Sequence, residues 1–265
     1  MDSSVMASIT IGFNGEKYLE QTIRSVLDQS YSNIQYIIIA GGSTDNSLNI
    51  IKKYAKNIYY WVSEKDKGIS DAFNKGIARA TGDVIGIINS DDWFEPLAFE
   101  RVAAQIGDAD ICYGDIQLWK NGRKELIQKG NLQVLNREMT IHHATVFVKR
   151  KIYETYGCFD LQYRCAMDYD LLLRFKVKNC RFAYIPEVLS NMRWGGFSDE
   201  FWKIGCRETL DIKNKYLPEK RLSNRLYYFK HLAAIRMAKT LSHLNLEFIT
   251  RIYRKLSPIK KIYND

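Results

Sequence analysis

The chain of 265 residues is 46% hydrophobic and 13% aromatic, which is enough apolar material to bury a large core. It contains no run of the ~20 apolar residues that a membrane span needs and no signal-peptide pattern at its start, so we expect a cytoplasmic protein. Its five cysteines form no CxxC pair, which argues against a zinc site or a disulfide framework.

The net charge of +9 is unevenly distributed. Residues 200–265 hold 15 Lys and Arg but only 6 Asp and Glu, so this last quarter carries the whole excess. Such a segment could contact nucleic acid or an anionic membrane surface, or could be a solvated face. No nucleic-acid recognition motif accompanies it, so nucleic acid is not an expected partner.

Apolar runs alternate with amphipathic stretches through the first hundred residues. Buried strands are predicted over 6–13, 34–39, 58–62 and 85–88, with helices between them, the first over about 18–28. This alternation with short turns predicts an α/β fold with a doubly wound, mostly parallel sheet.

Each of these strands is followed by a polar or glycine-rich loop, at 13–15, 41–43, 66–68 and 89–92. In a parallel sheet the carboxyl ends of the strands meet at one edge, so a phosphate-bearing ligand is expected there. The chain has neither GxGxxG after the first strand nor GxxxxGK[ST], which disfavours dinucleotide oxidoreductases and P-loop enzymes.

Asp91 and Asp92 directly follow the Ile-rich strand. Two adjacent carboxylates repel each other and resist burial unless a cation lies beside them, and Mg²⁺ or Mn²⁺ is commonly held by such groups. The alternative is a polar turn in which Asp92 caps the helix that Pro96 helps to start.

Residues 110–200 contain further candidates. Strands are predicted over 111–116 and 118–119. His142 and His143 are adjacent, and neighbouring side chains on a strand point to opposite faces, so on a strand at most one of the two should reach a shared site. Asp168 stands at the start of a helix expected from Tyr169, either as its N-cap or as a functional carboxylate. The Gly195-Gly196 loop is either a lid or an ordinary turn.

Five of these motifs, in this order and spacing, resemble those of family 2 glycosyltransferases, and most of all the bacterial members that build O-antigen, capsule or exopolysaccharide. The resemblance covers roughly residues 5–200. The motifs are Thr10–Asn14, Gly41–Asp45, Asp66–Gly76, Asn89–Asp92 and Asp168–Leu171.

The resemblance implies a GT-A fold, inversion at the anomeric carbon, a nucleotide-sugar donor and Mn²⁺ or Mg²⁺. Proton removal from the acceptor and a cation at the leaving diphosphate are the two needs of such a displacement. The residues that the resemblance assigns are Asp168 as general base, Asp91 and Asp92 at the metal with Asp91 also near the ribose, and Thr10, Phe13, Asn14, Ala40, Lys67, Asp71 and Asn74 around the nucleotide-sugar.

Ala40 departs from the family, which usually has an Asp at this position. Loss of that carboxylate should weaken donor binding by ~1–3 kcal/mol per hydrogen bond. Either an engineered Asp→Ala substitution or a naturally altered donor site would explain it. Phe73 stands where other branches of the family keep an Arg.

The structure of the basic segment over 200–265 is predicted from the periodicity of its apolar residues alone. Apolar residues share one side of a helix predicted over 246–256, and basic residues take the other. Such a helix suits either the membrane interface or packing onto the catalytic domain. Residues 222–241 have apolar groups all round, so burial or pairing is expected there.

These observations predict a GT-A domain over 1–200, with a nucleotide-sugar-binding half over 1–109 and an acceptor half over 110–200, followed by a basic helical extension over 201–265. The expected activity is transfer of a hexose, from UDP-glucose or UDP-galactose, to a polyprenyl-diphosphate-linked saccharide at the inner face of the cell membrane. The alternative is a decayed nucleotide-sugar-binding or scaffold protein.

Overall fold

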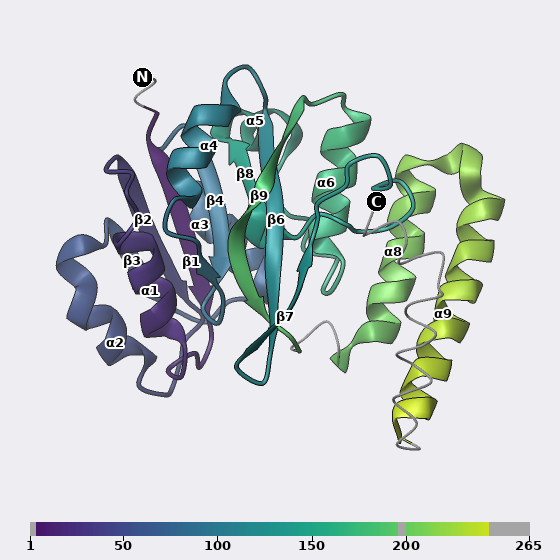
Figure 1. Ribbon diagram of the computed structural model, residues 1–265, viewed down its shortest axis with the longest axis horizontal. Helices are drawn as coiled ribbons and strands as arrows, with labels where there is room; N and C mark the ends of the chain where they lie inside the picture. Colours follow the sequence, from purple (N-terminus) through teal and green to yellow (C-terminus); the bar gives the residue numbers. More distant parts are fainter. Residues whose placement is uncertain (1–3, 196–199, 244–265) are drawn as a thin grey trace.

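The computed structural model describes residues 4–195 and 200–243, which form one sheet flanked by helices and followed by a helical pair (Figure 1). The strands are β1 (Met6–Gly12), β2 (Ile34–Ala40), β3 (Tyr60–Ser63), β4 (Val84–Asn89), β5 (Trp93–Phe94), β6 (Ile111–Lys120), β7 (Arg123–Gln128), β8 (Val146–Lys149) and β9 (Phe182–Arg193). The helices are α1 (Leu19–Leu27), α2 (Ser47–Tyr54), α3 (Ile69–Arg79), α4 (Ala98–Ile106), α5 (Arg150–Tyr156), α6 (Met167–Val177), α8 (Trp202–Tyr216) and α9 (Arg221–His243).

The described strands form one sheet in the order β3-β2-β1-β4-β8-β6-β9-β5, with β7 paired to β6. β3, β2, β1 and β4 run parallel to one another, and β6 runs parallel to β9. β8 is antiparallel to both β4 and β6 and so joins the two halves. The predicted α/β fold, a mostly parallel sheet followed by a helical extension, is confirmed.

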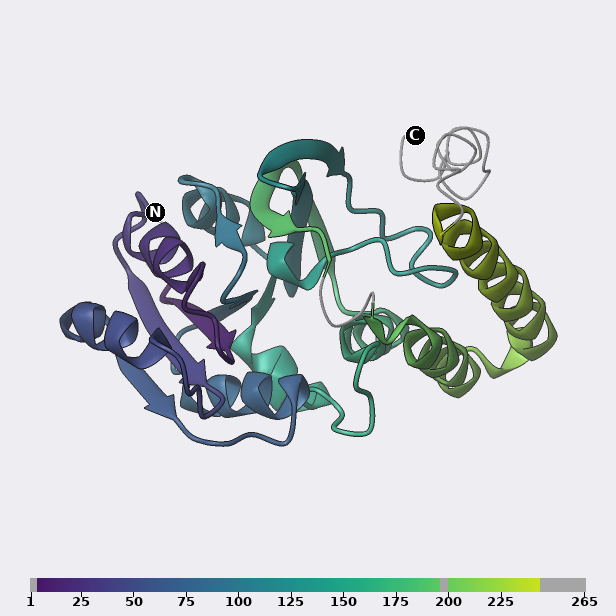
Figure 2. The same cartoon turned by 90° about the horizontal axis from the view of Figure 1, so that it is seen from below.

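Two apolar layers hold the sheet between its helices (Figure 2). Ile37 faces the layer under α3 and α6, whereas Ile38 faces the layer under α1, α2 and α4, and both side chains are buried. This is why the parallel strands are apolar on both faces. Gly76 lets α3 approach β1 closely, because a Cβ there would lie 2.4 Å from the Cγ2 of Ile9.

The second half of the sheet differs in detail from the prediction. Residues 111–120 form one continuous strand, β6, where two were expected. His143–Thr145 is a 3₁₀ turn, η2, ahead of β8 rather than part of a strand. The long β9 and the exposed β7 were not predicted.

The last described helices, α8 and α9, pack against each other beyond β6 and β7 (Figure 1). None of the described helices has the length and apolar character to cross a membrane. Of the burial or pairing expected over 222–241, burial within the described chain is wrong for one face of α9, where Leu222, Leu226 and Phe229 are exposed; pairing with another molecule stays a prediction. The helix predicted over 246–256 lies outside the described residues.

Candidate active site

The loops that follow β1 and β2 are tied together at the carboxyl edge of the sheet. The backbone N–H of Asn14 donates to the Ser43 hydroxyl (3.0 Å), and the Asn14 side-chain oxygen accepts from the N–H of Thr44 (2.9 Å). Asn14 has a left-handed backbone (φ 51°), a conformation that Asn tolerates better than most residues. Phe13 beside it is 63% exposed and leaves an aromatic face open at this edge.

Two residues assigned to the nucleoside pocket are buried. Thr10 is fully buried, and its hydroxyl lies 3.0 Å from that of Tyr36, so this hydroxyl already has a partner inside the sheet. Ala40 ends β2, is 3% exposed and lines a small cavity together with the hydroxyl-bearing Ser43 and Ser90. The missing carboxylate would therefore have pointed toward hydroxyl groups at the sheet edge.

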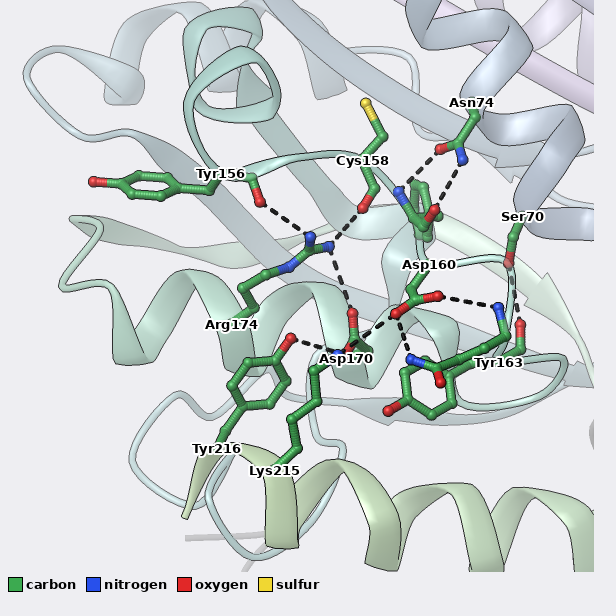
Figure 3. Close-up of polar contacts among 12 residues, drawn as sticks. Ser70, Asn74, Tyr156, Cys158, Asp160, Tyr163, Asp170, Arg174, Lys215 and Tyr216 are labelled. Atoms are coloured by element: carbon green, nitrogen blue, oxygen red, sulfur yellow. Dashed lines mark hydrogen bonds and ion pairs between the residues drawn. The ribbon is translucent and has the colours of Figure 1, made fainter. Parts of the chain in front are cut away.

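Three further residues expected around the nucleotide-sugar, Lys67, Asp71 and Asn74, lie at or near the start of α3. The Asp71 carboxylate accepts the backbone N–H of Lys67 (2.9 Å) and pairs with Lys75 (3.5 Å). Asn74 clamps the backbone of Phe159, donating to its carbonyl (2.8 Å) and accepting from its N–H (2.9 Å) (Figure 3). Asn74 thus joins α3 to the loop before α6.

Asp91 and Asp92 form a tight turn between β4 and β5. The Thr22 hydroxyl lies 2.6 Å from the Asp92 carbonyl oxygen, which fixes this turn against α1. The Asp92 side chain is only 2% exposed, and burial together with the charge of Asp91 raises its pKa to about 7. The alternative role as a helix cap is excluded, because α4 starts at Ala98 and its cap is Leu97.

Arg193, the last residue of β9, lies beside this turn. Its backbone N–H donates to Asp92 Oδ1 (3.2 Å), and its guanidinium donates to the Asp91 carbonyl. The guanidinium is sandwiched between the rings of Tyr18 (3.8 Å) and Trp93 (4.4 Å). This residue was missed from the sequence, because only the Gly195-Gly196 loop that follows was considered.

Asp168 lies in the first turn of α6 and is not its N-cap, which is Ala166. Its Oδ2 accepts a hydrogen bond from His143 Nδ1 (3.1 Å), and the two side chains are 22% and 18% exposed. Burial lowers the pKa of His143, but the charges of Asp168, Asp92 and Asp91 outweigh it and raise that pKa above its ordinary value. His143 therefore links the base candidate electrostatically to the adjacent carboxylates.

His142 behaves differently. Burial and the neighbouring charge of His143 lower the pKa of His142 to about 4, so it is neutral near pH 7. The prediction about these two histidines assumed a strand, but His143 begins a 3₁₀ turn and His142 precedes it; of the two, His143 pairs with Asp168.

Helix α6 is anchored by α8 at both sides of Asp168. The Glu208 carboxylate accepts the backbone N–H groups that precede α6, from Arg164 (2.9 Å), Cys165 (2.8 Å) and Ala166 (2.9 Å). The Ala166 N–H, at the N-cap, is a donor that a helix start leaves unsatisfied, and the negative charge of Glu208 suits the helix dipole.

The second anchor is the fully buried Asp170. Its carboxylate accepts from Tyr216 (3.0 Å) and Lys215 (3.2 Å) of α8 and lies 3.5 Å from the guanidinium of Arg174 (Figure 3). Arg174 in turn donates to the carbonyls of Tyr156 and Cys158. Cations on both sides compensate this buried charge and fix the helix that carries Asp168.

The turn that carries Asp91 and Asp92 supplies some of the ligands that a divalent cation needs. Asp92 is a buried carboxylate with a raised pKa next to a second carboxylate, which is the condition that a bound cation would relieve. Within residues 4–195 and 200–243, no three His, Cys, Asp or Glu side chains gather so as to hold a metal by themselves. Asp91 and Asp92 would thus supply part of a coordination shell, which donor phosphate oxygens and water would complete.

The sequence was compared with family profiles and with known proteins. The profile described as "Glycosyl transferase family 2" matches residues 9–167. An uncharacterized glycosyltransferase of Mycobacterium tuberculosis is 31% identical over 177 residues, 63% of this chain and 66% of that protein. A PGL/p-HBAD biosynthesis glycosyltransferase of Mycobacterium bovis is 29% identical over 184 residues, 66% of this chain and 70% of that protein.

Solved structures share the fold at low identity. Residues 1–349 of S. aureus TarS in complex with UDP give a TM-score of 0.64 at 16% identity, over 86% of this chain and 70% of that one. The mannosyltransferase PcManGT of Pyrobaculum calidifontis, with GDP-Man and Mn²⁺, gives 0.67 at 15% identity, over 98% and 84%. The profile match over most of the sheet, the GT-A architecture and the carboxylates at its edge agree: the chain belongs to glycosyltransferase family 2.

Proposed function

We propose that the protein transfers one hexose from a UDP-sugar to a lipid-linked saccharide, with inversion, in the assembly of a bacterial surface polysaccharide. The observation that carries this proposal is the meeting of Asp91, Asp92 and the Asp168–His143 pair at the carboxyl edge of the sheet. The relatives named for PGL/p-HBAD biosynthesis and, in Bacillus subtilis, as glycosyltransferase EpsH support a saccharide or glycolipid acceptor.

In the proposed reaction Asp168 removes the proton of the acceptor hydroxyl. The hydroxyl oxygen attacks the anomeric carbon from the face opposite the diphosphate, and the bond from that carbon to the diphosphate oxygen breaks with its electron pair leaving on the diphosphate. A divalent cation at Asp91 and Asp92 would neutralise the charge of the departing diphosphate. Arg193 adds a fixed positive charge beside the same turn.

The nucleoside would occupy the edge formed by the loops after β1 and β2. Phe13 offers an exposed ring for stacking on the base, and the interlocked Asn14 and Ser43 keep the two loops at fixed spacing. Ala40 leaves the position of the usual carboxylate apolar, so donor recognition there rests on the surrounding hydroxyl groups and backbone.

The proposed membrane contact is the exposed face of α9. Leu222, Leu226 and Phe229 lie one helical turn apart on it, and no Asp or Glu occurs anywhere in this helix. Arg225 and Lys230 are exposed beside them. An apolar stripe bordered by cations is typical of helices that lie on anionic bilayers, where a polyprenyl-linked acceptor would reside.

The test is nucleotide release from a panel of UDP-sugars with Mn²⁺ and a short polyprenyl-diphosphate saccharide. The protein and its Asp168→Asn variant are compared, together with the Ala40→Asp variant of each. We expect UDP release only when the acceptor is present and Asp168 is intact. This release should occur either in the protein itself or only in its Ala40→Asp variant. UDP binding without release in every form would favour the scaffold alternative.

A further inference from the structure

The contacts of Asp168 are unevenly divided between its two carboxylate oxygens. Oδ2 accepts the hydrogen bond from His143 Nδ1 (3.1 Å). Oδ1 is buried and has no hydrogen-bond partner among the described residues. Because a carboxylate rotates about one bond, the contact with His143 is the polar interaction that sets its plane in this structure.

His143 is itself held in place. Its ring packs against Phe73 of α3, with ring centres 5.7 Å apart, and Phe73 packs on Phe159 at 4.8 Å. The histidine comes from η2 and the carboxylate from α6, so the pair joins two separate elements of the chain. A cavity lined by His143, Asp168 and apolar side chains adjoins the pair.

We propose that His143 is a positioning residue for the transfer reaction: its Nδ1–H holds the Asp168 carboxylate in the orientation in which it can remove the acceptor's proton. This inference rests on the proposed role of Asp168 as the base. A group that orients the base affects mainly the chemical step, because the hydrogen bond of His143 is to Asp168 and its interaction with the Asp91–Asp92 turn is through charge alone.

The proposal predicts a split between kinetic constants. His143→Phe keeps an aromatic ring against Phe73 but loses the donor, and should lower kcat about 10- to 100-fold, as expected for a hydrogen bond to a charged group, with donor KM changed less than about twofold. His143→Asn should restore most of kcat, because its amide nitrogen is as many bonds from the backbone as Nδ1. His143→Gln places the same group one bond further out and should not.

Two comparisons separate this role from a general loss of structure. His142→Asn changes the neighbouring buried histidine, which acts on Asp168 only through its charge and is neutral near pH 7, and should leave kcat near that of the parent protein. In the Asp168→Asn background, His143→Phe should lower the residual rate less than about twofold, because the group on which it acts is already gone. Thermal unfolding of each variant is the control that measures whether it is folded.

The outcomes are distinct. Unchanged kcat in His143→Phe, a tenfold rise in donor KM alone, or equal losses in the Asn and Gln variants would each overturn the proposal. Full activity of Asp168→Asn would instead overturn the proposed base, whatever the His143 variants do.

Discussion

Replacing Asp92 with Asn should stabilise the protein while abolishing its function. The pKa of Asp92 rises from 3.8 to about 7 on folding, because the side chain is buried and lies beside Asp91. A difference of about three between the folded and unfolded values corresponds to roughly 4 kcal/mol. Between about pH 4 and pH 7 the folded state binds more protons at this carboxyl, so its contribution to stability falls as pH rises through that window.

The assay is urea unfolding of the parent and Asp92→Asn proteins in EDTA at several pH values. The variant should be about 2–4 kcal/mol more stable at pH 8 and differ by less than about 1 kcal/mol at pH 4, where the carboxyl is neutral. Mn²⁺ should stabilise the parent protein at pH 8 but not the variant. A pH-independent difference, or a less stable variant at pH 8, would refute the account of a buried, uncompensated carboxylate.

Three further predictions concern single sites. Glu208→Ala removes the acceptor of three backbone N–H groups before α6 and should lower the free energy of unfolding by about 2–3 kcal/mol in urea, with transfer activity reduced; an unchanged midpoint would contradict the anchoring role. Ala40→Asp should tighten UDP binding about tenfold in calorimetry, and equal affinities would make residue 40 irrelevant to the donor. Leu226→Glu with Phe229→Glu should release the protein from anionic liposomes without changing its melting temperature, because both side chains are exposed; retained binding would exclude this face of α9.

Periodicity predicted the parallel half of the sheet because its strands are apolar runs separated by turn residues. It missed β7, whose charged and exposed residues carry no alternating pattern, and β9, which contains Pro186 and Glu187 and has an irregular pairing with β6. Such edge and bulged strands are defined by their neighbours and not by their own sequence.

The candidate site likewise contains residues that the sequence predicts and contacts that only the structure shows. Motif order identified Asp91, Asp92 and Asp168, but a motif does not say which of its residues face the ligand. Thr10 is bonded to Tyr36 inside the sheet, a contact between strands that only the register reveals. Asp168 could have been the N-cap of its helix, but the N–H of the actual N-cap, Ala166, is bonded to Glu208, a distant residue that no local pattern predicts.

The most direct test of the central claim is the anomeric configuration of the product, followed by NMR, with a UDP-hexose, Mn²⁺ and a polyprenyl-diphosphate saccharide. The parent protein, or its Ala40→Asp variant if the parent is inactive, should form a product of configuration opposite to that of the donor. Asp168→Asn should lower that rate by about 10²- to 10⁴-fold, as expected for loss of a general base. Retained configuration, or an undiminished rate in Asp168→Asn, would contradict the mechanism built on this edge of the sheet.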